Sequence, residues 1–414
     1  MLLERFDVFL FDLDGVVYLG DELLPHARES LARLRSVGKT VLFLTNDPRP
    51  TRSEVARRLA RLGVEAHQRE IFASGWATAR YLEQSGVRST YVVGSPGLVS
   101  EIREAGVEVV ESGHPEAVVV GGDERTSYAH IERAVKLISG GARFVATNPD
   151  GSYPTPEGPI PGAGAVVAAI RAASNERPAV TVGKPYPQLF DLALEGLGVN
   201  TGRIVMVGDN PSTDILGAHR VGITGILVSK TPVRFPSIHD FRTPDTVIPD
   251  LSFLFDPKVS VRVWKSPSFS WPDRVEAGVA AVVFNHQDEV LLLRRAGHEL
   301  WSLPSGRVER GETIKEAMSR KVLGEAGLKV ASTRLIGVYS DPASQVFSFP
   351  ACETVQFITC CFRCVTVGDA LRADGTGASV AAFFNTEKLP VNLLPTHSKW
   401  LSDALASREH PCIR

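Results

Sequence analysis

Two aspartates that flank a single leucine are the first candidates for chemistry in this chain. Asp12 and Asp14 follow a short apolar run and precede Gly15. Two carboxylates at the end of a strand can take separate roles, because one side chain can face a substrate while the other reaches over it. Taken alone the pattern is weak, since aspartates before a glycine also cap helices and shape turns.

Polar residues follow three further apolar runs. Thr45 and Asn46 end the second run and can donate hydrogen bonds to a phosphoryl oxygen. Lys184 follows the third run and offers a point charge for phosphate. Asp209 and Asp214 follow the fourth and offer carboxylates to a hard cation. Because ligands bind at the carboxyl ends of parallel strands, we expect all four groups to share one crevice.

The segments that carry these residues alternate between strand and helix. Buried strands are expected at Val8–Leu13 and Val41–Thr45, with helices at His26–Val37 and Thr51–Leu62. The alternation returns later, with strands at Ala179–Val182, Arg203–Val207 and Thr224–Val228 and helices at Gln188–Leu197 and Thr213–Val221. This βα rhythm predicts an α/β fold, a doubly wound parallel sheet with helices on both faces.

A block between the two halves has strands and a helix of its own and is too long for a loop. We therefore expect an inserted α/β domain. The predicted organisation is a core made of residues 1–76 and 181–255, an inserted cap domain over 77–180, a linker over 256–272 and a third unit over 273–410. Pro, Ser and Lys without periodicity mark the linker.

At these residues the chain resembles the haloacid dehalogenase (HAD) superfamily. It looks most like the NagD and p-nitrophenyl-phosphatase branch, whose large cap of the C2 type lies between the second and third motifs. Matching strings within the cap are Gly121–Asp123, Thr147–Asp150 and Pro161–Ala165. The resemblance covers about residues 6–255 and implies a HAD Rossmann-like core with an inserted cap.

The resemblance also implies a phosphatase mechanism. Asp12 would attack phosphorus and form an aspartyl-phosphate, and Asp14 would protonate the leaving oxygen and then activate water. Mg2+ would be held by the Asp12 carboxylate, the Asp14 carbonyl and Asp209, with Asp214 bracing or completing the site.

Thr45, Asn46 and Lys184 would hold the phosphoryl oxygens. Many relatives have an asparagine where this chain has Asp47, and we expect altered local contacts there. In the cap, Thr147–Asp150 either contacts the substrate or forms the turn at a hinge, since Asn-Pro-Asp is a strong turn sequence.

A stretch from Gly306 to Leu328 resembles the Nudix box, and the resemblance over about residues 273–405 implies an α+β Nudix-like domain. Gly306, Glu312, Arg320 and Glu325 occupy the expected places for its site. Two expected carboxylates of the box helix are replaced, one by Lys321 and one by Gly324.

The replacement by Lys321 changes the local charge by two units where divalent cations would gather. Lys321 and Glu325 are four residues apart on a helix and are positioned to pair with each other. We expect this ion pair to stand in for the metal, which would make the domain weakly active or inactive.

Composition limits the partners and the compartment. A formal charge of -2 gives no support for binding to nucleic acid or to an anionic membrane. Five cysteines, an odd number, argue against a disulfide framework and for a reducing cytoplasm. The first strand begins almost at the N-terminus, which leaves no room for a signal peptide. We expect a soluble cytoplasmic protein.

Three functions are weighed. In the first, the chain is a Mg2+-dependent phosphatase of small phosphate esters, nucleotides included, whose Nudix-like unit binds, regulates or assembles a homodimer. In the second, the Nudix-like domain splits a nucleoside diphosphate conjugate and the HAD domain removes the phosphate exposed. In the third, both domains are sensors, which conflicts with the complete set of catalytic residues. The first is preferred.

Overall fold

The computed structural model describes residues 2–153, 155, 157–233, 235, 239–294, 299–349, 353–368, 370–371, 380–406 and 409–414. The chain forms two compact units, Met1–Ser266 and Pro267–Arg414, which are treated separately. The expected linker over 256–272 spans the boundary between them, so its first part belongs to the first unit.

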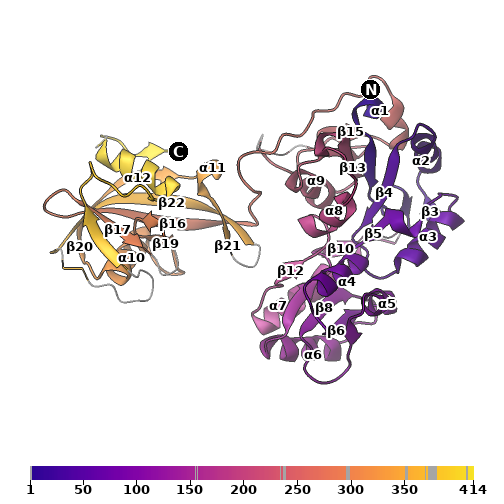
Figure 1. Ribbon diagram of the computed structural model, residues 1–414, viewed down its shortest axis with the longest axis horizontal. Helices are drawn as coiled ribbons and strands as arrows, with labels where there is room; N and C mark the ends of the chain where they lie inside the picture. Colours follow the sequence, from indigo (N-terminus) through magenta and orange to yellow (C-terminus); the bar gives the residue numbers. More distant parts are fainter. Residues whose placement is uncertain are drawn as a thin grey trace. The chain divides into compact units, whose positions relative to one another are not determined.

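The first unit is built around a six-stranded parallel sheet (Figure 1). Its strand order is β15-β14-β13-β1-β4-β5. The strands are β1 (Val8–Phe11), β4 (Thr40–Thr45), β5 (Ile71–Ala73), β13 (Ile204–Gly208), β14 (Thr224–Val228) and β15 (Thr246–Ile248). The central position of β1, between β13 and β4, places the residues after it in the middle of the sheet edge.

Helices cover both faces of this sheet, as predicted for a doubly wound fold (Figure 1). Along β1, Phe9 and Phe11 pack under α2 (Ala27–Ser36) and α3 (Arg52–Arg61). Leu10 faces the other side, where α8 (Pro187–Leu194) and α9 (Leu216–Arg220) lie. This alternation follows from the two-residue period of a strand whose two faces are both buried.

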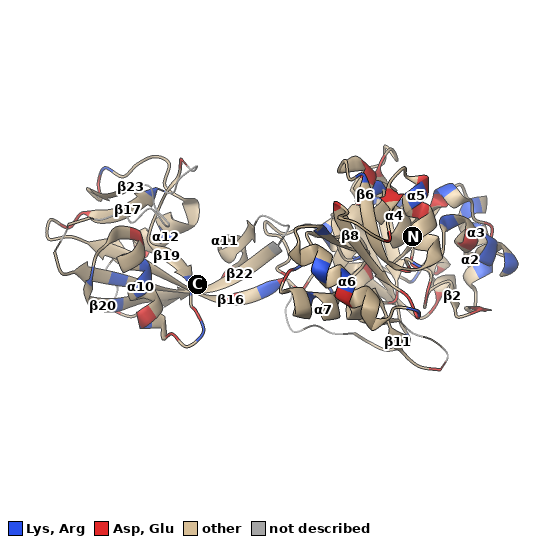
Figure 2. Cartoon of the chain, turned by 90° about the horizontal axis from the view of Figure 1, so that it is seen from below, with Lys and Arg blue, Asp and Glu red and all other residues tan. Residues whose placement is uncertain are grey.

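A second parallel sheet, of order β12-β9-β8-β6-β7, forms the inserted α/β part. Its elements are α4 (Ser74–Gln84), β6 (Ser89–Gly94), α5 (Pro96–Glu104), β7 (Glu108–Val109), β8 (Ala117–Gly122), α6 (Tyr128–Ser139), β9 (Arg143–Ala146), α7 (Ala163–Ser174) and β12 (Val180–Thr181). In Figure 2 charged segments are concentrated on helices such as α5 and α6, whereas β6 and β8 are uncharged.

One strand assignment from the sequence was wrong. The apolar run at 179–182 was expected to be the third strand of the core sheet, but β12 pairs in parallel with β9 of the second sheet. An apolar run indicates a buried strand without specifying the strand with which it pairs. Val180 lies opposite Val145 of β9, so this strand pairs within the second sheet. Lys184 therefore lies on the connection that leads from the second sheet into α8.

Residues after β15 remain attached to the first unit through Trp264. Its indole stacks on the buried His219 ring at 3.6 Å between centroids, and its Nε1 donates to the His219 carbonyl at 3.1 Å. Arg262 also pairs with Asp245, which accepts from His219 Nε2 at 2.8 Å. These contacts fix the chain up to the boundary of the unit.

The second unit contains a mixed sheet in which the long β16 (Arg274–Phe284) pairs in parallel with β22 (Glu353–Thr366). Other strands are β17 (Val290–Arg294), β18 (Trp301–Ser302), β19 (Ser305–Arg307), β20 (Val330–Tyr339), β21 (Val346–Phe349), β23 (Val380–Phe384) and β24 (Cys412–Ile413). Helix α10 (Ile314–Ala326) covers one face, and α12 (Pro395–Leu405) covers the other. This α+β arrangement is the one expected for the Nudix-like part.

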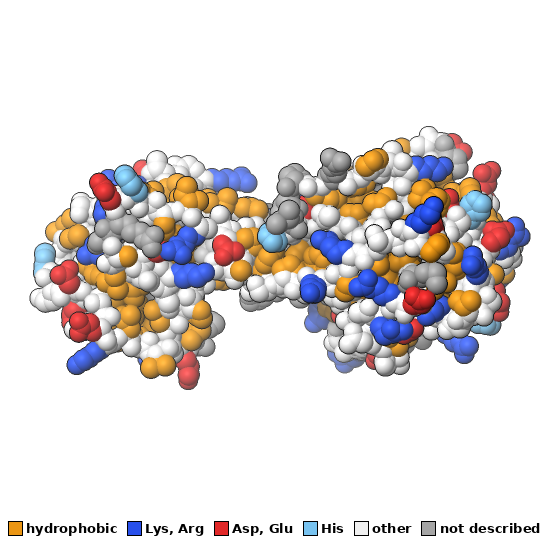
Figure 3. Space-filling view, turned by 90° about the horizontal axis from the view of Figure 1, so that it is seen from above, with side chains coloured by type: hydrophobic (Ala, Val, Ile, Leu, Met, Phe, Trp, Pro, Cys, Tyr) orange, Lys and Arg blue, Asp and Glu red, His pale blue; other side chains and the backbone are white. Residues whose placement is uncertain are grey.

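Three further features concern apolar helices, surface charge and the cysteines. No helix in the described residues is long and apolar enough to span a bilayer. On the face of the first unit seen in Figure 3, Lys and Arg side chains are interspersed with Asp and Glu. Four of the five cysteines are free thiols, namely Cys360, Cys361, Cys364 and Cys412; Cys352 lies outside the described residues.

Candidate active site

The site begins at Asp12, the first residue after β1. Its backbone N–H donates to the Val207 carbonyl at 2.9 Å, which extends the pairing between β1 and β13 by one residue. The Asp12 carboxylate accepts from the Leu13 N–H at 2.8 Å. The nucleophile predicted from the sequence is thus held at the carboxyl edge of the central strand, where parallel sheets bind ligands.

Lys184 joins two of the predicted aspartates. Its ammonium lies 2.8 Å from Asp12 Oδ1 and 2.7 Å from Asp214 Oδ1, and it donates to the Leu44 carbonyl at 3.2 Å. The side chain is only 1% exposed. Although Lys184 does not follow a core strand, its side chain reaches the same edge. Burial alone would lower the pKa of Lys184, but the two carboxylates outweigh that effect and raise it.

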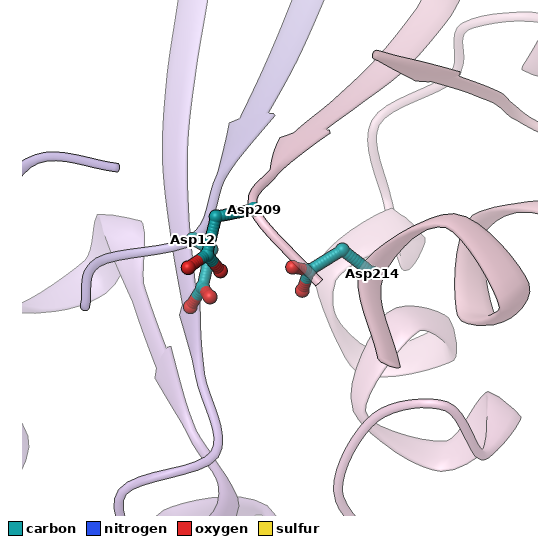
Figure 4. Close-up of side chains that lie close together, drawn as sticks. All are labelled: Asp12, Asp209 and Asp214. Atoms are coloured by element: carbon teal, nitrogen blue, oxygen red, sulfur yellow. The ribbon is translucent and has the colours of Figure 1, made fainter. Parts of the chain in front are cut away.

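Asp209 and Asp214 complete an acidic cluster with Asp12 (Figure 4). Each of the three offers a carboxylate oxygen, and these atoms lie within 4.8 Å of one another. Asp209 follows β13, and Asp214 lies in the π-helical turn Pro211–Ile215, where its Oδ2 accepts from the Asn210 N–H at 3.0 Å.

Two glycines allow this close approach. A Cβ at Gly15, whose φ is +83°, would lie 2.2 Å from Asp209 Oδ2. A Cβ at Gly208 would lie 2.2 Å from Asp214 Cγ. Side chains at either position would therefore displace a carboxylate, so the backbone of these turns is part of the site.

The acidic cluster has the charge and the donors that suit a divalent cation. When all three carboxylates are ionised, they and the one ammonium group carry two net negative charges in a buried place. Burial and repulsion by Asp214 raise the pKa of Asp209 to about 7. Burial likewise raises the pKa of Asp12 well above its ordinary value, against the attraction of Lys184. Carboxylate oxygens are the ligands that Mg2+ prefers, so the residues fit that ion.

Asp14 is not one of the three residues of the acidic cluster, and its pKa is shifted by different neighbours. Burial and the nearby Asp47 carboxylate raise its pKa to about 6, while Arg58 and Arg49 oppose the shift. A carboxyl group with a pKa close to the working pH can both give and accept a proton. Such a value suits the acid and base role that the sequence predicted for Asp14.

The Asn46 side chain forms hydrogen bonds with Lys184 and Asp150. Its Oδ1 accepts from the Lys184 N–H at 2.8 Å, and its Nδ2 donates to the Lys184 carbonyl and to Asp150 Oδ2, each at 2.9 Å. The Asn46 carbonyl accepts from Asn148 Nδ2 at 2.7 Å. The amide thus links the core to the Thr147–Asp150 segment. Its side chain, predicted to bind phosphate, is used for this junction.

Thr45, the last residue of β4, is the other predicted phosphate ligand from this strand end. It is 2% exposed, and its Oγ1 accepts from the Asp47 N–H at 3.0 Å. Since a hydroxyl group also has one hydrogen to donate, Thr45 retains a donor for a phosphoryl oxygen.

Arg49, for which no role was predicted, lies between the core and the inserted part and contacts both. Its guanidinium pairs with the Asp47 carboxylate at 2.8 and 2.9 Å. It also stacks over the Tyr153 ring at 4.1 Å, contacts the Tyr153 hydroxyl group and lies 3.5 Å from Glu124. The available signal was an Asp-x-Arg string that begins two residues after the end of β4. The altered contacts expected at Asp47 thus involve Arg49 and Asp14.

In the second unit, the predicted Nudix-like residues lie around β19 and α10. Glu312 accepts two hydrogen bonds from the Arg320 guanidinium, and this contact lowers the pKa of Glu312 to about 2. Gly306 lies in β19, and Glu325 is buried on α10.

The ion pair expected between Lys321 and Glu325 is not formed in the described residues. Lys321 extends over Gly306 instead, where a Cβ would lie 2.1 Å from its Cε and 2.6 Å from its Nζ.

Comparisons with known proteins find matching families for both parts of the chain. The haloacid dehalogenase-like hydrolase family matches residues 9–108, a second HAD-hydrolase-like family matches residues 181–254, and the NUDIX domain matches residues 275–405. An acid sugar phosphatase of Staphylococcus aureus (strain USA300) is 32% identical over 245 residues, which are 59% of this chain and 94% of that protein.

Solved structures show the same likeness for the first unit. A 4-nitrophenylphosphatase from Thermotoga maritima is 32% identical with a TM-score of 0.56, and the match covers 61% of this chain and 97% of that one. A glycerol phosphate phosphatase from Mycobacterium tuberculosis, solved in complex with magnesium, is 31% identical with a TM-score of 0.56, and the match covers 61% and 77%. The chain therefore belongs to the haloacid dehalogenase-like hydrolases, as a phosphatase that also carries a NUDIX domain.

Proposed function

We propose that the first unit is a Mg2+-dependent hydrolase of small phosphate monoesters, nucleotides included, that acts through an aspartyl-phosphate on Asp12. The placement of the Asp12 carboxylate carries the proposal. It shares the Lys184 ammonium with Asp214 and has Asp209 within 4.8 Å. A simple ion pair between Lys184 and one aspartate would not require the other two carboxylates. A centre for phosphoryl transfer does require several fixed charges, cations included, around its nucleophile.

In the first half of the reaction, the Asp12 carboxylate oxygen forms a bond to phosphorus as the ester P–O bond breaks. Asp14 supplies the proton that the leaving oxygen takes up. Lys184 and the Thr45 hydroxyl group stabilise the charge on the phosphoryl oxygens, because they are fixed before the substrate arrives.

In the second half, a water molecule attacks phosphorus, Asp14 accepts its proton, and the bond between phosphorus and Asp12 breaks. Inorganic phosphate leaves and both carboxyl groups return to their starting states. The raised pKa of Asp14, about 6, supports this use of one group as acid and then as base.

Mg2+ would be held by Asp12 and Asp209, by the Asp14 carbonyl and by Asp214, directly or through its neighbours. When bound, it would neutralise charge that develops on the transferring phosphoryl group. The chain's own part is to hold the carboxylates together, which Lys184 does by bridging Asp12 and Asp214.

The substrate is proposed only as a class. The three relatives carry different substrate names at 31 to 32% identity, so no single name transfers to this chain. What they share is a small organic phosphate. The Arg49–Tyr153 contact between core and inserted part supports a site that closes around such a molecule.

We also propose that the NUDIX domain is an accessory with little or no hydrolase activity. Lys321 and Gly324 stand where the resemblance calls for carboxylates, and the Lys321 ammonium extends over Gly306. A fixed positive charge there opposes the collection of divalent cations. The two-step alternative, in which this domain first splits a diphosphate, is less well supported for that reason.

The first prediction concerns Asp12→Asn in the full chain. Phosphate release from small monoesters should fall on the order of a thousandfold or more, because the amide cannot form the covalent intermediate. The measurement is inorganic phosphate release across a panel of monoesters with Mg2+ or EDTA. Asp21→Asn, at a 97% exposed side chain, is the matched control and should retain activity. Undiminished release by Asp12→Asn would refute the mechanism.

A second prediction concerns pH and the metal. Protonation of Asp209, with a pKa of about 7 in the absence of a cation, competes with Mg2+. Apparent Mg2+ affinity should therefore weaken as the pH falls below about 7, by about tenfold per pH unit for each proton displaced. Calorimetric Mg2+ titrations at several pH values test this, and proton release should accompany binding. A Mg2+ affinity that stays constant across this pH range would contradict the proposed competition between protons and Mg2+ at Asp209.

A third prediction separates the junction role of Asn46 from general stability. Asn46→Ala removes the side-chain bonds to the Lys184 backbone N–H, to the Lys184 carbonyl and to the Asp150 carboxylate, which should cost about 1–3 kcal/mol of unfolding free energy. By shifting Lys184 it should also reduce kcat/KM about tenfold or more. Asn148→Ala, which loses a bond to Asn46 but none to Lys184, should destabilise the fold with a smaller kinetic effect. Equal kinetic losses in the two variants would argue against positioning of Lys184.

The fourth prediction tests the NUDIX domain within the full chain. With phosphatase activity removed by Asp12→Asn, nucleoside diphosphate conjugates should be turned over at background rates in Mg2+. Adding Lys321→Glu and Gly324→Glu should restore measurable turnover, because it supplies carboxylates for a cation. Robust Mg2+-dependent cleavage by Asp12→Asn alone would instead establish the two-step enzyme.

A further inference from the structure

Helix α9 supports two charged residues of the active site. It continues the π-helical turn that contains Asp214, so the position of this carboxylate follows the position of the helix. The helix also packs against the residue after Lys184. A Cβ at Gly217 would lie 3.2 Å from Pro185 Cα, and Arg220 donates to the Pro185 carbonyl at 3.4 Å. The Asp214 and Lys184 side chains, 2.7 Å apart, therefore both depend on where α9 lies.

Helix α9 is too short to keep this position by itself. It has five residues, and isolated helices shorter than about 12 residues are marginal in water. Tertiary contacts must fix it, and one set is made by His219, whose side chain is 0% exposed. Its Nε2 lies 2.8 Å from Asp245 Oδ2, and its Nδ1 lies 2.6 Å from the Phe241 carbonyl oxygen. Asp245 also accepts from the Gly225 N–H of β14 at 3.0 Å, which ties the helix to the sheet.

The chain after the sheet clamps the His219 ring. The Trp264 indole stacks on this ring with the two planes 5° apart, and its Nε1 donates to the His219 carbonyl at 3.1 Å. Phe241 packs edge-on against the same indole, with 5.1 Å between the centroids. Arg262 donates to the Asp245 carboxylate at 3.0 Å through Nε and to the Asp245 carbonyl at 3.1 Å through its backbone N–H. Trp264 thus contacts both the side chain and the backbone of α9.

This clamp lies outside the part of the chain that matches the phosphatase family. The match to the HAD-hydrolase-like family ends at residue 254, whereas the clamp segment covers residues 256–266. Further contacts hold the clamp segment to the first unit. Arg5 donates to the Val261 carbonyl at 3.1 Å, and Val259 and Val261 pack against the core. A simple tether between two domains needs none of these contacts.

We propose that Trp264 is a positioning residue of the phosphatase, which acts through His219 and α9 to hold Asp214 beside Lys184. The inference rests on the proposed Mg2+-dependent phosphatase function. With the indole in place, α9 is fixed against the sheet and the acidic cluster keeps its geometry. Without it, α9 is free to shift, and a displacement of about 1 Å is enough to reduce metal affinity and rate. The segment that leads to the NUDIX domain is thereby part of the phosphatase.

The first test compares two variants of the full chain by calorimetric Mg2+ titration without substrate. Trp264→Ala should weaken Mg2+ affinity roughly tenfold, as is usual when the support of a metal ligand is removed. Phe255→Ala is the matched control, because it also removes an aromatic ring that packs on a charged side chain, at 4.2 Å from the Arg33 guanidinium. Phe255 packs on the face of the sheet opposite α9, so its variant should bind Mg2+ as the wild type does. Equal Mg2+ affinities for the wild type and Trp264→Ala would overturn the proposal.

Two further variants identify the contact responsible. Trp264→Phe keeps a ring on His219 and loses only the indole N–H, so it should retain more of the Mg2+ affinity than Trp264→Ala. His219→Gln removes the stack while Trp264 remains, and it should weaken Mg2+ affinity as Trp264→Ala does. Thermal unfolding verifies that each variant is folded. If Trp264→Ala does not fold, His219→Gln decides the question, and an unchanged Mg2+ affinity in that variant would refute the proposal.

Phosphate release separates this inference from the proposed function. In the variants that bind Mg2+ weakly, kcat/KM for small monoesters should fall about tenfold or more at a fixed, limiting Mg2+ concentration. A wild type without Mg2+-dependent phosphate release would refute the phosphatase function itself. An active wild type together with a fully active Trp264→Ala would refute only the positioning role of Trp264.

Discussion

The active site depends on one buried ammonium group. Lys184 lies between Asp12 and Asp214, within 2.8 Å of both, and is almost fully shielded from solvent. Without it, three carboxylates would face one another at low dielectric with no ammonium group to offset their mutual repulsion. With it, the Asp12 carboxylate is held in one orientation, as the proposed nucleophile requires, and the remaining carboxylates can offer negative charge to a cation.

The same lysine connects catalysis to the inserted part of the fold. Its backbone leaves the second sheet after β12, and Asn46 holds that backbone through both its N–H and its carbonyl. The Asn46 amide also contacts Asp150, so the junction between the core and the insertion and the position of the ammonium group are set by one side chain. A change in the position of the insertion would therefore be felt at Lys184 through this junction.

Much of the first site was predictable, because the strands β1, β4 and β13 are short apolar runs and their ends share one edge by the topology of a parallel sheet. That reasoning identified Asp12, Thr45 and Asp209. It failed for the partner of β12, because an apolar run specifies burial and not its neighbour. It also did not foresee the engagement of Asn46, since a hydrogen bond to a residue 138 positions away depends on tertiary packing.

Charge balance distinguishes the two sites that this chain contains. At the phosphatase site, carboxylates outnumber the ammonium group, so a cation completes the charge and a phosphate can then be bound. In the NUDIX domain, the Lys321 ammonium group lies against Gly306, and this fixed positive charge opposes the binding of a divalent cation. The Glu312 carboxylate and the Arg320 guanidinium of the same domain are paired. Under the proposed accessory role, the positive charge of Lys321 is the feature of this domain that works against metal-assisted hydrolysis.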